Sequence, residues 1–196
     1  MVTMAHTSVP SWALRPQRQP AGPEAARAWV LTFDRESAPE TWIRELTSAD
    51  VPHDVLRLSD ASAEEITDSV TRLTAEATVG GRLLLHGPVA EVLTARAAAL
   101  DLGFLDGEIL VWTTAVETIP LFCVHCQHQF LVQARIDDVV PCGACGTELV
   151  IYYHLSRRQG SFMGFKHNAE AWPPHKPADS TPGGHPRARM TAGVAA

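Results

Sequence analysis

Apolar and polar residues alternate in blocks between residues 27 and 118. Four short apolar runs bounded by turn residues are typical of buried strands, and three segments between them carry apolar residues at helical spacing. One expected helix begins at N-cap Ser37, and another begins with the capping-box pair Ser62 and Glu65. The expected strands are 28–33, 54–58, 82–86 and 108–112, and the expected helices are 37–46, 62–80 and 88–103. This alternation predicts an α/β domain with a small doubly wound, mainly parallel sheet.

The two ends of the chain lack any such period. Both are rich in proline, and the C-terminal stretch also contains Gly183-Gly184. Stretches of this kind bury too little apolar surface to offset the entropy of ordering the chain. We therefore expect a disordered N-terminal tail over 1–26, the α/β domain over 27–118, a small β domain over 119–170, and a disordered Pro/Gly-rich tail over 171–196.

The small β domain is expected because all four cysteines of the chain fall in two Cys-x-x-Cys pairs. These are Cys123-Val-His-Cys126 and Cys142-Gly-Ala-Cys145. Each pair can aim two thiolates at one point, and two facing pairs make a tetrahedral site with four sulfur ligands. The segment between the pairs holds one strand-like run over 130–133 and a return over 137–140. This pattern predicts a C-terminal zinc ribbon of two knuckles joined by a hairpin.

The identity of the ion is left open between two metals. Four thiolates suit zinc and iron alike, but a mononuclear iron site usually has a longer separation between the pairs, so zinc is expected. With all four positions filled by protein, the zinc would be structural rather than catalytic. His125 or His128 could replace a cysteine, and two disulfides would require an oxidising compartment.

Charge limits the classes of partner. The formal net charge is −6, with −10 in residues 28–118 and zero in residues 119–170. Ribbons that bind nucleic acid do so with a basic face, so the pattern favours a protein partner. Residues 1–19 lack the apolar core of a signal peptide, and no run is long enough to span a membrane. We expect a cytoplasmic protein that binds neither nucleic acid nor membrane.

A Gly-Pro turn after the third expected strand is a candidate nucleotide contact. Gly87 and Pro88 follow His86 at the carboxyl edge of the sheet and precede a helix, whose N-terminus would point amides at this edge. The chain has neither a G-x-G-x-x-G nor a P-loop motif. Residues 85–93 and the following strand resemble the last βαβ unit of ferredoxin-reductase-type NAD(P) domains. This chain has His86 where that family has a cysteine, so the resemblance supports the fold more than the cofactor.

A second resemblance covers residues from about 119 to 166. The two Cys-x-x-Cys pairs are followed by Tyr152-Tyr-His-Leu-Ser-Arg-Arg158 and by Gly160-Ser-Phe-Met-Gly-Phe165. This arrangement resembles the C-terminal domain of the small subunit of bacterial dimethylamine monooxygenase, the DmmA-like family. The resemblance implies a subunit of a multi-component, NADPH-dependent monooxygenase that converts dimethylamine to methylamine and formaldehyde.

The same resemblance implies that partner subunits carry the redox cofactors. The chain has no flavin motif, and four cysteines are too few for both an iron–sulfur cluster and a zinc site. Flavin, iron–sulfur, NADPH and haem chemistry are therefore expected on partners, and no residue of this chain is assigned a catalytic role. Two alternatives remain: a nicotinamide-binding reductase component, and a zinc-ribbon adaptor in nucleic-acid metabolism.

The segment over 154–165 also allows two interpretations. Phe162, Met163 and Phe165 form an apolar patch edged by arginine and histidine, which is a candidate docking surface. Alternatively, the same side chains cover the small core of the ribbon. His154 and His167 are expected to have structural rather than haem-binding roles.

Overall fold

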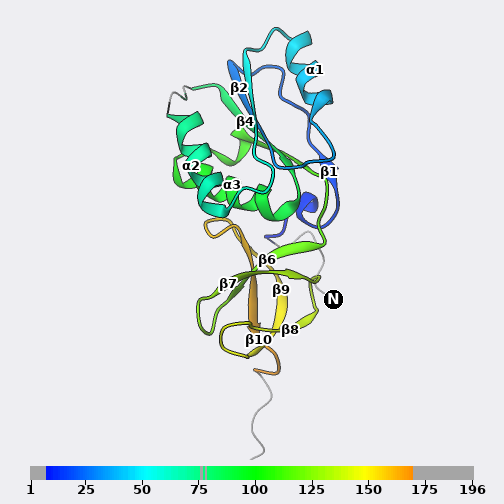
Figure 1. Cartoon of the computed structure of the whole chain (residues 1–196), viewed down its shortest axis with the longest axis vertical. Coiled ribbons are helices and arrows are strands. Elements are labelled where there is room, and N and C mark those ends of the chain that lie inside the picture. The colour runs from blue at the N-terminus through cyan, green and yellow to red at the C-terminus, as the bar shows by residue number, and fades with distance from the viewer. Residues whose placement is uncertain (1–7, 76, 78, 170–196) are drawn as a thin grey trace, which may run out of the picture.

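The computed structural model describes residues 8–75, 77 and 79–169, which form two five-stranded sheets joined end to end (Figure 1). The first sheet has the strand order β1-β5-β4-β2-β3, in which β2 to β5 run parallel and β1 is antiparallel to β5. The α/β class expected from the sequence is confirmed. Its strands are β1 (Gln17–Arg18), β2 (Arg27–Thr32), β3 (His53–Arg57), β4 (Gly81–Gly87) and β5 (Ile109–Thr113).

Helices cover both faces of this sheet. Helix α1 (Glu40–Ser48) packs Trp42 and Leu46 against one face, together with Val30 and Leu84. Helices α2 (Ala63–Thr74) and α3 (Val89–Asp101) pack against the opposite face. Two single turns, η2 (Ser11–Ala13) and η3 (Asp106–Glu108), complete this part of the molecule.

The helix starts differ in how well the sequence predicts them. In α2 the capping box is present, because the Glu65 amide donates to Ser62 Oγ and the Ser62 amide donates to Glu65 Oε2. The expected start of α1 is wrong, since the helix begins at Glu40 and Pro39 occupies the N-cap. The Ser37 hydroxyl donates instead to Asp34, in the loop that follows β2.

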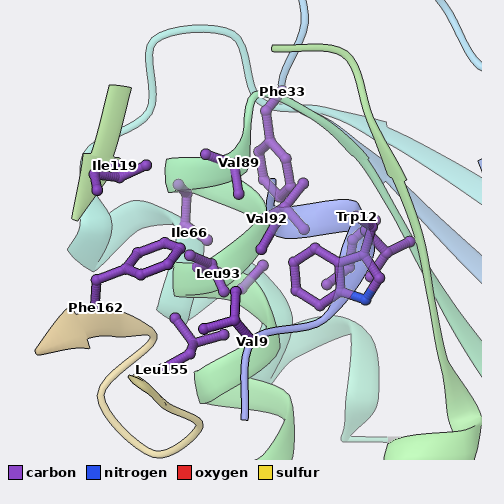
Figure 2. Packing of buried hydrophobic residues seen from close by; sticks show 14 of the residues in the cluster. Val9, Trp12, Phe33, Ile66, Val89, Val92, Leu93, Ile119, Leu155 and Phe162 are labelled. Atoms are coloured by element: carbon purple, nitrogen blue, oxygen red, sulfur yellow. The ribbon is translucent and has the colours of Figure 1, made fainter. Parts of the chain in front are cut away.

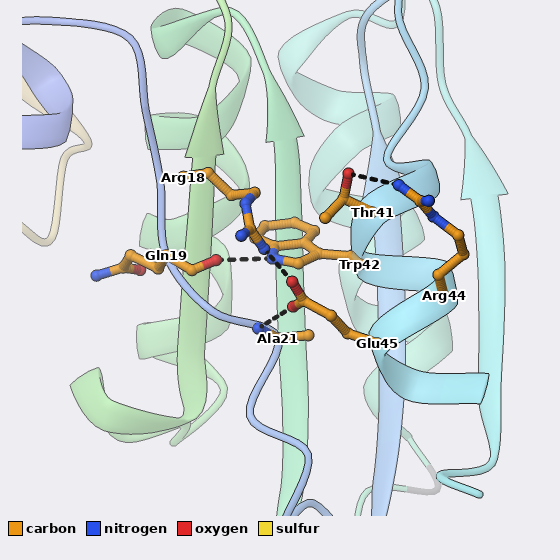
Figure 3. Close-up of polar contacts among 7 residues, drawn as sticks. All are labelled: Arg18, Gln19, Ala21, Thr41, Trp42, Arg44 and Glu45. Atoms are coloured by element: carbon orange, nitrogen blue, oxygen red, sulfur yellow. Dashed lines mark hydrogen bonds and ion pairs between the residues drawn. The ribbon is translucent and has the colours of Figure 1, made fainter. Parts of the chain in front are cut away.

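Residues 8–26 are not a disordered tail. Val9, Trp12 and Ala13 are buried in the main core, and β1 adds a strand to the edge of the sheet. The segment then crosses to α1, where the Trp42 indole N–H donates to the Gln19 carbonyl and Glu45 accepts from the Ala21 amide (Figure 3). These contacts fix a proline-rich stretch that has no periodic pattern of its own. Residues 1–7 and the expected tail over 171–196 lie outside the described residues.

The second sheet differs from the expected ribbon hairpin. Its strand order is β7-β6-β10-β9-β8, so β7 and β8 lie at opposite edges and do not pair with each other. Strand β7 pairs with β6 and β8 pairs with β9, both antiparallel, which makes each Cys-x-x-Cys pair the turn of its own hairpin. The strands are β6 (Thr118–Cys123), β7 (Gln129–Gln133), β8 (Val139–Pro141), β9 (Glu148–Ser156) and β10 (Ser161–Lys166).

One hydrophobic core runs through both sheets. Trp12 and Phe33 from the first half share a cluster of buried side chains with Leu93, Leu155 and Phe162 (Figure 2). No helix in the described part of the chain is long and apolar enough to cross a membrane.

Candidate metal centre

The two Cys-x-x-Cys turns have the same backbone geometry. In the first, the Gln127 amide donates to the Cys123 carbonyl over 2.8 Å, and Gln127 has a φ of 63°. In the second, the Gly146 amide donates to the Cys142 carbonyl over 2.9 Å, and Gly146 has a φ of 70°. A residue in the left-handed region closes each turn four positions after the first cysteine. This repetition points both pairs of side chains toward one place.

The four sulfurs form a compact group. All four Sγ atoms lie within 4.8 Å of one another. The Sγ atoms of Cys123 and Cys145 are 3.9 Å apart, and those of Cys126 and Cys142 are 3.7 Å apart. A tetrahedral ion with bonds of about 2.3 Å requires sulfur separations of about 3.8 Å. A disulfide would require about 2.05 Å, so these four cysteines are positioned to bind a metal.

The centre is half enclosed by protein. Cys123 ends β6 and Cys142 directly follows β8, and both are buried in the core, whereas Cys126 and Cys145 lie in the exposed part of each turn. Hydrogen bonds from Thr147 and His125 lower the pKa of Cys145 to about 5. The His128 amide also favours the Cys126 thiolate, but burial and the three neighbouring sulfurs raise the pKa of Cys126 to about 12. Four clustered thiols therefore resist full ionisation unless a cation offsets their charge.

Neither neighbouring histidine joins the sulfur group. The metal-binding group found among the described residues contains the four cysteines alone. His125 makes a hydrogen bond to Cys145, so it supports a ligand instead of replacing one. His128 stacks on Phe130 with ring centroids 5.8 Å apart.

Gly87 and Pro88 have packing roles at the sheet edge, far along the chain from the sulfurs. A Cβ atom on Gly87 would lie 2.9 Å from the Phe33 Cβ, because the ends of β2 and β4 approach closely there. Pro88 is the N-cap of α3, and the Val89 amide donates to the Ala115 carbonyl. The hollow of 310 Å³ beside Pro88 is lined by Glu91 and Glu117 and by no basic residue. Two carboxylates make this hollow unfavourable for a dinucleotide phosphate.

A polar cluster at the same sheet edge could not be assigned from sequence. The His86 ring is fully buried, with Nδ1 2.8 Å from Thr32 Oγ1 and Nε2 3.4 Å from Ser37 Oγ. Ser37 gives its own proton to Asp34 Oδ2, so its oxygen accepts from Nε2–H and Nδ1 accepts from Thr32. Burial lowers the pKa of His86, while Asp34 and Glu40 partly oppose this effect. The sequence shows that these polar residues stand at the ends of expected strands. Whether they contact one another depends on the register of β2 and β4, which the sequence does not give.

The expected apolar patch near the C-terminal end of the ribbon is divided between the two sides of the sheet. Phe162 is buried in the shared core and is 1% exposed. Phe165 is 37% exposed and lies against Tyr152, with ring centroids 4.7 Å apart. The buried part of the patch supports the core-covering interpretation, and the exposed part leaves a small aromatic surface.

One comparison with known proteins covers the segment that holds this centre. Residues 120–165 match the family model for the C-terminal domain of dimethylamine monooxygenase subunit DmmA-like proteins. The second sheet, with its four cysteines, is thus similar to a DmmA-like C-terminal domain, in agreement with the sequence resemblance.

Part of the chain is also similar to a curated relative. The chain is 35% identical over 89 residues to the heme-dependent oxidative N-demethylase delta subunit of Ectopseudomonas mendocina (strain ymp). This match covers 45% of the chain and 50% of the length of the relative. No solved structure matches the chain.

Proposed function

We propose that this chain is a non-catalytic subunit of a multi-subunit oxidative N-demethylase, a monooxygenase. The observation that carries the proposal is the DmmA-like domain over residues 120–165, folded around a complete set of four cysteine ligands. The similarity to a delta subunit supports the same conclusion, since a delta subunit works with others.

The four cysteines would hold a structural zinc ion. Four thiolates fill a tetrahedral shell and leave no position for water or substrate. The metal would join the β6–β7 turn to the β8–β9 turn, and so fix two edges of the second sheet. Zinc is preferred to iron because the pairs lie close in sequence, with fifteen residues between Cys126 and Cys142.

The oxidative chemistry would take place on other subunits. All four cysteines of the sequence lie in one centre, which leaves none for an iron–sulfur cluster. Partners would therefore carry the flavin and iron–sulfur reductase, the NADPH site and the haem. The reaction would consume dimethylamine, O2, NADPH and a proton, and yield methylamine, formaldehyde, NADP⁺ and water.

Co-expression tests the proposal. The tagged chain is produced together with haem-bearing and reductase subunits of an oxidative N-demethylase, purified, and analysed for subunits and metal. We expect haem-bearing and reductase subunits to co-purify with it, and about one zinc ion per chain. Failure of these subunits to co-purify would remove the assembly proposal. Iron in place of zinc would leave the assembly standing and correct the metal.

A titration with NADPH tests the alternative reductase role on the isolated chain. The acidic hollow beside Pro88 and the packing of Gly87 on Phe33 lead us to expect no saturable binding. Saturable binding that Gly87→Ala abolishes would instead favour the nicotinamide-binding role.

A further inference from the structure

A small polar hollow of 110 Å³ lies where several parts of the chain meet. Ser8 and Trp12 come from the N-terminal segment, Arg96 from α3, and Arg157 from the turn between β9 and β10. Asp106 lines the same hollow from η3. The hollow is too small for a nucleotide, but it has room for a few waters or one small anion.

The charges around this hollow do not balance. Arg96 Nη2 donates to Asp106 Oδ1, and Arg157 Nη1 lies 3.4 Å from Asp106 Oδ2. Two guanidinium groups thus share one carboxylate, which leaves one positive charge in excess. Arg96 is only 7% exposed and is poorly reached by bulk water, whereas the Arg157 side chain is 60% exposed and its charge is screened.

The Arg96 guanidinium contacts Asp106 and the Trp12 ring and lines the hollow. Within the described residues, its recorded hydrogen bond uses Nη2 alone, while the group lies over the Trp12 ring at 5.8 Å. The hollow that Arg96 lines lies beside this guanidinium.

We propose that this hollow is a binding site for a small oxyanion, a carboxylate or phosphate group, held between Arg96 and Arg157. The planar fork of a guanidinium matches both kinds of oxyanion, and charge-assisted hydrogen bonds are the strong ones in proteins. The repulsion between two neighbouring guanidiniums would fall when the anion binds.

The electrostatic environment of Arg96 supports this assignment. Burial lowers the pKa of Arg96, and the nearby Arg157 acts in the same direction against Asp106. An anion would oppose both effects. Bound there, it would also connect the N-terminal segment, α3 and the β9–β10 turn, so occupancy would stabilise the junction of the two sheets.

Thermal unfolding and calorimetric titration of the full, metal-loaded chain test the proposal. The probes are sodium phosphate and sodium acetate, each compared with sodium chloride at equal ionic strength. We expect a saturable rise in Tm and measurable binding for at least one oxyanion beyond the effect of chloride. The two probes separate tetrahedral from planar recognition.

Matched variants locate the site. Arg157→Ala should weaken oxyanion binding about tenfold, since a hydrogen bond to a charged group contributes about 1.5 kcal/mol or more. Arg158→Ala is the control, because Arg158 is the exposed neighbour and does not line the hollow. Arg96→Lys keeps the charge but removes the fork, and should weaken binding to a similar extent without opening a large cavity.

Three results would overturn the site. The first is an oxyanion effect no larger than that of chloride. The second is equal weakening by Arg157→Ala and Arg158→Ala, which would indicate general surface charge. The third is unchanged affinity in Arg96→Lys, which would show that the buried fork does not recognise the ligand.

Discussion

Cys142 shows how a single ligand links metal and stability. Its side chain is 2% exposed and belongs to the core, while its Sγ lies 3.7 Å from that of Cys126. A serine there keeps the size of the side chain but supplies no thiolate. Since binding free energy of a structural metal is also folding free energy, the two should be lost together.

We therefore expect Cys142→Ser to lose bound metal and about 4 kcal/mol or more of the free energy of unfolding. Elemental analysis and calorimetric melting measure the two quantities on one sample. His128→Ala is the control, because His128 stacks on Phe130 outside the sulfur group and should retain the metal. Unchanged thermal stability in a metal-free Cys142→Ser protein would contradict a structural role.

His86 is a second residue whose environment has a measurable consequence. Its pKa is lowered by burial from 6.5, so the folded protein binds fewer protons than the unfolded chain as the pH falls below that value. The stability is then complete above pH 6.5 and is lost as the pH falls toward the lowered pKa of the folded state. The limiting slope for one proton is about 1.4 kcal/mol per pH unit.

Denaturant unfolding of wild type and His86→Gln between pH 5 and pH 7.5 tests this expectation. The variant is less stable at pH 7.5, because the contacts to Thr32 and Ser37 are disturbed. The difference in stability should narrow toward pH 5, since only the unfolded wild-type chain takes up the histidine proton and glutamine takes up none. A constant difference across the range would show that His86 does not titrate in the expected direction.

At the scale of elements, the sequence predicts best what is held by local contacts. The capping box of α2 involves residues three positions apart, and each cysteine turn closes within five. The N-terminal segment depends on distant partners instead. Thr113 Oγ1 donates to the Trp12 carbonyl, and the Val111 amide donates to Gln19 Oε1. No pattern within residues 8–26 encodes these pairings, so the sequence does not predict that this segment is ordered.

The pairing of the ribbon strands was missed for a similar reason. Strand β10 lies between β6 and β9, parallel to β6 and antiparallel to β9. It separates the two cysteine hairpins, whereas the local sequence predicts that one hairpin joins the two cysteine turns directly. The candidate metal ligands were unaffected, because spacing within each Cys-x-x-Cys turn determines where the sulfurs point.

The turn between β9 and β10 depends on a glycine at the junction of the sheets. Gly160 has a φ of 59°, and a Cβ atom there would lie 2.5 Å from the Leu93 carbonyl oxygen of α3. We expect Gly160→Ala to lose about 3 kcal/mol of stability, from left-handed strain and from displacement of the turn. Chemical denaturation measures the loss.

Gly107→Ala provides the matched control for this prediction. Gly107 lies in η3 near the same junction, and nothing stands within 4 Å of an added Cβ atom. The substitution should change stability by less than about 1 kcal/mol. Equal losses in the two variants would mean that the contact of the turn with α3 does not hold the sheets together.

At the scale of the whole molecule, the strands connect the metal centre to the junction. Strand β6 runs from the linker at Thr118 to Cys123, and β9 runs from beside the second cysteine turn to Ser156 near the junction. Between these ends, Leu121 and Ile151 belong to the same core cluster as Leu93 of α3. Binding of a metal by the four sulfurs should therefore affect the packing of α3.

Removal of the metal with a chelator should reduce amide-exchange protection first in the second sheet and also in α3 around Leu93. The helix loses protection because its partner Phe162 sits on β10, which is held between the two cysteine hairpins. Helix α1 is the internal control, since Trp42 and Leu46 belong to a separate core cluster on the other face of the first sheet. Hydrogen exchange followed by mass spectrometry resolves these segments. Loss of protection confined to the second sheet, with α3 as protected as α1, would show that the metal stabilises the second sheet alone.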